Sequence, residues 1–258
     1  MIRPAKRAIH RALNAVGYEI SRPAFGVHEN AFDAQEHILG ALDVTVVIDA
    51  GANEGQTSLQ YARRFPAATI HAFEPFSKSF AILEVAARRQ PRIVPHQEAV
   101  GDREGSRRLH LNARASTNSF FETSAAAREY VDARLMETVD VEEVPVTTLD
   151  VFCDRNHVQH VDVLKLDVQG SELLALRGAT GLLSEHRVDV VYSETLFASL
   201  YEGQAGFCDL HAELSRHGYG LYGIFDLNYG TNGLLAWADG LWVSPSVGRT
   251  GKAAGRRR

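Results

Sequence analysis

Acidic and glycine residues follow one another closely over residues 46–58, which read VVIDAGANEGQTS. A buried strand is expected to end at Asp49, and the chain then turns through Gly51 and Gly55 into a helix. Such a turn, at the carboxyl end of a parallel strand, is the usual ligand site of an open α/β sheet. Gly51 would let a ligand approach the backbone closely, and the helix start offers N–H groups to a carboxylate or phosphate. The run therefore predicts a small-molecule site, and the alternative is a turn needed only for packing.

The residues around the turn distinguish two kinds of ligand. A dinucleotide-binding turn has three glycines in the spacing G-x-G-x-x-G, whereas Asn53 and Gln56 stand at the second and third positions here. Asp49 would repel a pyrophosphate, but it suits a cation such as the ammonium of a methionine group. The turn therefore favours S-adenosylmethionine over NAD.

A second acid, Glu74, follows the next expected strand in the run FEP, residues 73–75. It comes about 20 residues after the glycine turn, where an acid can accept both ribose hydroxyls of an adenosine. Alone, a glutamate at a strand end is more often a solvated surface residue. Two acids after two consecutive parallel strands together predict a nucleoside site without identifying the nucleoside.

A third polar group lies in the run VLKLDVQGSE, residues 163–172. Asp167 would stand at the carboxyl end of the fourth strand, and Glu194 would end the adjacent strand. Either carboxylate can orient a hydroxyl or take its proton, so both are candidate catalytic residues. The pair is also compatible with a Mg²⁺ site that lowers the pKa of an alcohol, which is the less favoured alternative because no tighter carboxylate-rich spacing occurs. We favour a structural role for Lys165, and Glu172 can cap a helix or contact a substrate.

Strand-like and helical segments alternate around these residues. Strands are expected over 44–48, 69–73, 93–97, 162–166 and 188–193, with helices over 56–64, 78–89, 172–176 and 207–217. This alternation is typical of a mostly parallel sheet with helices on both faces. Two late strands, over 220–225 and 233–243, follow without an intervening helix and predict an antiparallel edge.

Changes in composition divide the chain into parts. We expect an N-terminal helical extension (1–43), a main domain (44–246) with an inserted lid or loop (112–143), and a disordered basic tail (247–258). The extension should contain helices over 5–16 and 29–42, and the insertion a helix over 125–138.

Charge is distributed unevenly along the chain. The first 22 residues carry +4 and the last ten +5, which leaves −14 on residues 23–248 out of a total of −5. Such an acidic body argues against a nucleic-acid channel, because that mode of binding needs clustered Lys and Arg. The basic helix over 5–16 either docks on the domain, which we favour, or makes weak peripheral contact with a membrane. Apolar runs long enough for a membrane span or a secretory signal are missing, so a soluble cytoplasmic protein is expected.

Six short runs together resemble the FkbM family of S-adenosylmethionine-dependent methyltransferases, within the Rossmann-like methyltransferase class. They are IDAGANEG (48–55), FEPF (73–76), EAVGD (98–102), VTTLD (146–150), LKLDVQGSE (164–172) and LRGA (176–179). They occur in the order of the family, and their combination is far more specific than any one of them.

This resemblance implies an α/β fold, a Rossmann-like sheet of about seven strands that is mostly parallel with an antiparallel edge strand. It also implies methyl transfer to a hydroxyl of a sugar, glycolipid or natural-product scaffold. By position it assigns Asp49, Gly51, Asn53 and Gly55 to the methionine end of the cofactor, Glu74 and Pro75 to its ribose, and Ala99 and Val100 to its adenine edge. The alternative is a non-catalytic S-adenosylmethionine or nucleotide-binding protein that is recruited through its basic ends.

Overall fold

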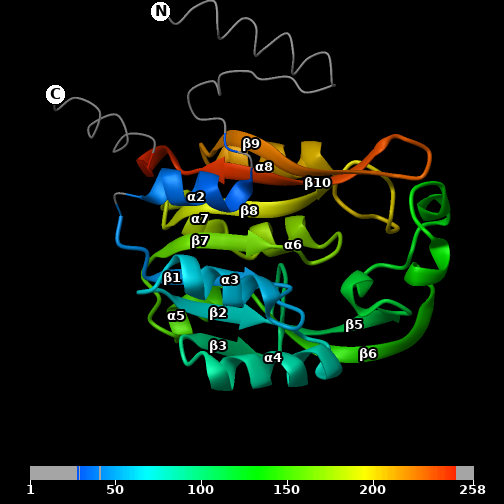
Figure 1. Ribbon diagram of the computed structural model, residues 1–258, viewed down its shortest axis with the longest axis horizontal. Coiled ribbons are helices and arrows are strands. Elements are labelled where there is room, and N and C mark those ends of the chain that lie inside the picture. The colour runs from blue at the N-terminus through cyan, green and yellow to red at the C-terminus, as the bar shows by residue number, and fades with distance from the viewer. Residues whose placement is uncertain (1–27, 29, 41, 248–258) are drawn as a thin grey trace, which may run out of the picture.

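A seven-stranded sheet forms the centre of the protein in the computed structural model, which describes residues 28, 30–40 and 42–247. In spatial order its strands are β3 (Ile93–His96), β2 (Thr69–Phe73), β1 (Val46–Ala50), β7 (Val161–Leu166), β8 (Val188–Leu196), β10 (Leu235–Val243) and β9 (Gly220–Tyr229). Neighbours from β3 to β8 are parallel, whereas β10 runs antiparallel to both β8 and β9 (Figure 1). This order confirms the predicted α/β fold class and its antiparallel edge. The helix predicted over 5–16 and the basic tail lie outside the described residues.

Helices cover both faces of this sheet. One layer contains α2 (Ala31–Leu39), α3 (Gln56–Arg64) and α4 (Ser77–Arg89), and the other contains α5 (Leu149–Arg155), α6 (Glu172–Arg177), α7 (Thr180–Ser184) and α8 (Phe207–Arg216). Successive strand residues point to opposite faces. Val47 therefore packs in the core beneath the first of these helix layers, and Ile48 packs in the core beneath the second. None of the described helices has the length and hydrophobicity that a membrane span requires.

A second, three-stranded sheet was not predicted from the sequence. Its strands, in spatial order, are β4 (Ala99–Val100), β6 (Thr138–Thr147) and β5 (Gly105–Asn112). Strands β5 and β6 are antiparallel, and Figure 1 shows them beyond the carboxyl end of β2. The predicted insertion, 112–143, therefore overlaps the end of β5 and the start of β6. The segment between these strands lies beside the edge of the large sheet at which its parallel strands end.

The helix predicted over 125–138 was wrong. This part of the chain forms two short 3-10 helices, η2 (Ala125–Glu129) and η3 (Ala133–Met136), and η1 (Ala115–Thr117) precedes them. The side chains of Ser124 and Asp132 each accept an N–H bond from a residue two positions later, which starts a new turn each time. Such local bonds compete with a continuous α-helix.

Candidate functional site

A cavity lies where the carboxyl ends of β1, β2 and β7 meet the small sheet. It contains about 690 Å³ of space between atoms, part of it open to solvent. Of the residues predicted for cofactor or catalysis, its lining includes Gly51, Asn53, Glu74, Pro75, Ala99, Val100 and Asp167. The topology therefore brings together residues that are far apart in the sequence, and we call this space the first cavity.

Glu74 is the acidic side chain at the end of β2. It is buried, and its two carboxylate oxygens accept the N–H groups of Asn53 at 2.8 Å and Phe76 at 2.9 Å. Burial raises the pKa of Glu74 from 4.5 to about 7. A carboxylate oxygen can accept more than one hydrogen bond, so Glu74 can still receive hydroxyl donors from a ligand in the cavity.

The two glycines of the turn lie where a side chain would collide with neighbouring atoms of the protein. Gly51 has φ +75°, and a Cβ atom there would collide with the carbonyl oxygen of Asp167 at the end of β7. Gly55 has φ +89°, and a Cβ atom there would lie 2.9 Å from Leu83 on α4. The space beside Gly51 that we expected a ligand to use is therefore occupied by the neighbouring strand end. Gly51 still lines the first cavity, whereas Gly55 is not among its lining residues.

Asp49 is fully buried and faces Lys165, its register partner on β7. One Asp49 oxygen accepts the Ser58 hydroxyl at 2.6 Å, and the other lies 3.0 Å from the Lys165 Nζ. Burial alone would lower the pKa of Lys165, but the carboxylates of Asp49 and Asp167 raise it above its usual value. Lys165 therefore stays charged, ties β7 to β1, and lies 3.6 Å from the Asp167 carboxylate. Asp49 is not among the residues that line the first cavity.

A second cavity, with about 790 Å³ of space between atoms, adjoins the first. The two cavities share Ser116, Asp167 and Gln169. Glu194 joins Asp167 and Gln169 at the polar inner end of the second cavity. The remaining wall combines the polar Arg114, Thr117 and Tyr201 with a larger apolar part made of Val131, Leu135, Met136, Leu196, Leu200 and Trp237. A molecule with a mainly apolar body and some polar groups would fit such a space.

Asp167 and Glu194 lie next to each other on neighbouring strands, because Leu166 pairs with Ser193 in the β7–β8 register. The Gln169 side-chain amide donates to both carboxylates, at 2.8 Å to Asp167 and 2.9 Å to Glu194. Burial raises the pKa of Glu194 well above its usual value, and the negative charge of Asp167 raises it further.

Further acids surround this junction. Burial raises the pKa of Glu172 to about 7 and the pKa of Asp239, on β10, to about 6. The Glu172 carboxylate accepts the N–H groups of Val168 at 2.9 Å and Gly170 at 3.3 Å, so it shapes the loop after β7. Carboxyl groups thus outnumber the Lys165 cation at the junction of the two cavities, and a positively charged ligand there would favour their ionised forms.

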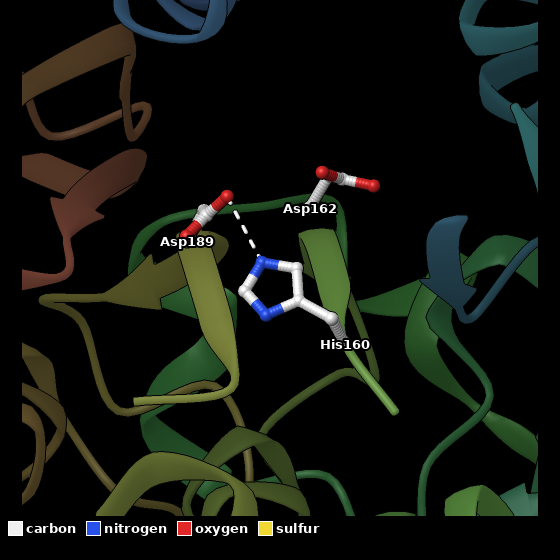
Figure 2. Close-up of side chains that lie close together, drawn as sticks. All are labelled: His160, Asp162 and Asp189. Carbon is white, nitrogen blue, oxygen red and sulfur yellow. Dashed lines mark ion pairs between the residues drawn. The ribbon is translucent and has the colours of Figure 1, made fainter. Parts of the chain in front are cut away.

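Three possible metal ligands lie together where β7 and β8 begin, at the end of these strands that is opposite to the cavities. Figure 2 shows His160, Asp162 and Asp189, whose ligand atoms all lie within 4.8 Å of one another. The His160 Nε2 is 3.0 Å from the Asp189 carboxylate, and this hydrogen bond raises the pKa of His160. Asp162 accepts the N–H groups of Thr45 and Val46, before and at the start of β1. Since β7 and β8 begin here and the cavities lie where they end, this group is separate from the site. Mg²⁺ in the second cavity stays a prediction.

Comparison with known proteins shows which protein family this chain is similar to. A model of the methyltransferase FkbM domain matches residues 49–221. A "Methyltransferase 1" of Beauveria bassiana is 26% identical over 187 residues, which cover 69% of this chain and 73% of that protein. The "31-O-demethyl-FK506 methyltransferase FkbM" of Streptomyces tacrolimicus is 34% identical over 154 residues, which cover 52% of this chain and 58% of that protein.

Two further similarities agree with this family. The "2-O-methyltransferase NoeI" of Sinorhizobium fredii is 26% identical over 166 residues, 62% of this chain and 66% of that protein. The crystal structure of a methyltransferase FkbM from Methylobacillus flagellatus KT has a TM-score of 0.50 and 18% sequence identity. That similarity covers 78% of this chain and 44% of the other chain, and it shows the fold. Of these four proteins, the chain spans less than two thirds of the length of all but the one from Beauveria bassiana.

Proposed function

This chain belongs to the FkbM methyltransferase family, and we propose that it transfers a methyl group from S-adenosylmethionine to a hydroxyl oxygen of a sugar, glycolipid or natural-product scaffold. One observation carries this proposal. The first cavity has the lining of a nucleoside site, and it meets a second cavity at a pair of carboxylates, Asp167 and Glu194. A protein that only binds the cofactor does not need the second cavity. The non-catalytic alternative is therefore the weaker one.

The residues of the first cavity fit S-adenosylmethionine. Glu74 can accept the ribose hydroxyls, and Ala99, Val100, Leu109 and Phe120 offer apolar surface to the adenine. The excess of acids around Asp167 suits the positive charges of the sulfonium and the ammonium. When it is bound, this cofactor supplies a methyl group on a positively charged sulfur atom, which an oxygen nucleophile can accept.

The carboxylates of the second cavity would act on the acceptor hydroxyl. Asp167, whose carboxylate lies 3.6 Å from the Lys165 Nζ, would orient the O–H group and take its proton as the oxygen becomes nucleophilic. Glu194 would hold the same hydroxyl from the neighbouring strand. Because the Asp167 side chain is 42% exposed, the proton can then pass to solvent.

The walls of the second cavity indicate what the acceptor looks like. Their apolar residues favour an acceptor with an apolar body that presents one hydroxyl to Asp167 and Glu194. Two relatives have names that agree with transfer to oxygen, a 31-O-demethyl-FK506 methyltransferase and a 2-O-methyltransferase. These considerations support an alcohol on a hydrophobic scaffold over a free sugar.

Titration of Glu74 should make cofactor binding depend on pH. The ionised form accepts ribose hydroxyls more strongly, so affinity for S-adenosylmethionine should fall as the pH drops below about 7, the pKa of Glu74 in the folded protein. Glu74→Gln should bind about 1.5–3 kcal/mol more weakly at high pH, because hydrogen bonds to a charged group have this value. It should also lose most of the pH dependence. Calorimetry on both sides of pH 7 measures the affinity of each protein for S-adenosylmethionine. If the affinity depends on pH equally in the wild type and in Glu74→Gln, the ribose binds elsewhere.

The proposed function is tested by binding and transfer together. Calorimetry should detect S-adenosylmethionine and not NAD, because the turn is not built for a pyrophosphate. With methyl-labelled cofactor and a panel of hydroxylated hydrophobic compounds and glycolipids, label should appear in an acceptor. Binding of the cofactor with no transfer to any of these acceptors would favour the non-catalytic alternative.

A further inference from the structure

Gln169 occupies the point at which the two cavities meet, and its side chain lies between the two carboxylates. Its φ of 53° is in the left-handed region, which glutamine seldom adopts. The next residue, Gly170, has φ 92°, and Glu172 holds this loop through its carboxylate. An unusual backbone conformation at a site is a reason to ask what the side chain does there.

All polar atoms of the Gln169 amide have partners. Its Nε2 donates to Asp167 at 2.8 Å and to Glu194 at 2.9 Å, and its Oε1 accepts the Tyr201 hydroxyl at 2.8 Å. An amide nitrogen carries two hydrogens, so each carboxylate receives one of them. The Tyr201 hydroxyl also lies 3.1 Å from the Thr117 carbonyl oxygen. Because ionised carboxylates only accept hydrogen bonds, the Nε2 end of the amide is the end that suits Asp167 and Glu194.

The charges around the pair make these two hydrogen bonds important. Lys165 on β7 is a cation, whereas Glu172 on α6 and Asp239 on β10 are acids that face the pair from the other elements. Two carboxylates side by side repel each other, and Asp167 is exposed enough to turn toward solvent. A neutral donor between them opposes both effects.

We propose that Gln169 is a positioning residue for the transfer reaction. Its amide holds Asp167 and Glu194 at a fixed separation where the cavities meet, and it stabilises the negative charge of Asp167. This inference rests on the proposed function. The insertion contacts the backbone of the same residue, because the Ser119 hydroxyl donates to the Gln169 carbonyl at 2.6 Å. Side-chain variants of Gln169 therefore leave this contact available.

The decisive variant is Gln169→Asn. Asparagine tolerates the left-handed backbone and keeps an amide, but its side chain is one methylene shorter and cannot reach both carboxylates. We expect kcat to fall about 10²-fold, as for a misplaced catalytic group, with the Kd for S-adenosylmethionine and the acceptor KM changed less than about threefold.

Two further variants separate positioning from a structural role. Gln169→Glu keeps the length of the side chain but has no N–H donors at neutral pH, so it should lose activity at least as strongly as Gln169→Asn. The matched control, Ser119→Ala, removes a hydrogen bond to the backbone of Gln169 and should leave kcat within about threefold of the wild type. If Ser119→Ala lowers kcat as much as Gln169→Asn does, the insertion is responsible and the proposal is wrong.

A measurement on the cofactor-free protein makes the test independent of turnover. Carboxyl ¹³C NMR, with Asp167 and Glu194 assigned by their loss in Asp167→Asn and Glu194→Gln, should show a shifted resonance for at least one of the two in Gln169→Asn, because the shorter amide cannot donate to both. Unchanged resonances in a folded Gln169→Asn protein would overturn the inference. A wild-type protein that transfers no methyl group would instead refute the proposed function, and the spectra would still be readable.

Discussion

Asp167→Asn should turn over about 10²- to 10⁴-fold more slowly than the wild type, while its affinity for S-adenosylmethionine stays within about threefold. Asparagine has nearly the same shape and keeps a hydrogen-bond acceptor, but it cannot take a proton. Asp167 lies between Lys165 and Gln169 at the inner end of the second cavity. Steady-state kinetics gives the rate, and calorimetry gives the affinity.

The pH and metal dependence of Asp167→Asn identify the missing function. If its activity recovers at high pH, where the acceptor loses its proton more readily, basicity is what the variant lacks. If added Mg²⁺ affects only the wild type, the metal alternative gains support. Full turnover by the variant at neutral pH would contradict both roles and direct attention to Glu194, for which Glu194→Gln is the matching substitution.

The second large effect concerns the buried pair of Asp49 and Lys165. Asp49 is fully buried and the Lys165 side chain is 5% exposed, so Lys165→Met would leave a carboxylate without its cation in the core. Breaking a buried pair by removing one partner typically costs about 3–5 kcal/mol in the free energy of unfolding. Urea denaturation of the two proteins measures this loss.

The double variant Asp49→Asn/Lys165→Met is the control for this prediction. It removes both charges, so it should recover a large part of the stability that Lys165→Met loses. The prediction would be wrong if Lys165→Met were less than about 1 kcal/mol less stable than the wild type and the second substitution added no stability. The pair would then not be important for stability.

The main sheet could be predicted because its central strands are buried on both faces. Strand β7, for example, is buried along its whole length and is apolar apart from Asp162 and Lys165, and helices with capping and glycine signals separate these strands. The second sheet was missed because β5 and β6 are largely exposed and carry many charges. The alternation of valines over residues 139–146 was a possible signal for β6.

The sequence predicts the site residues that stand at the ends of strands. It does not predict the contacts that depend on which strands are neighbours in the sheet. Glu74 and Asp167 each follow a strand, so the sequence indicates that both lie at the same edge. The pairing of Asp49 with Lys165 requires β7 to lie beside β1, which a linear pattern does not reveal. The same adjacency explains why Gly51 must be glycine. Nor could the sequence show that Gln169 bridges Asp167 and Glu194.

The most direct test of this account follows the methyl carbon itself. Wild-type protein is incubated with S-adenosylmethionine carrying a ¹³C-labelled methyl group and with the acceptor found in the panel, and the product is analysed by NMR. We predict that the label is bound to a former hydroxyl oxygen of the acceptor, and that Asp167→Asn forms the same product at the reduced rate given above. Label on a carbon or nitrogen atom of the acceptor would contradict the proposed reaction.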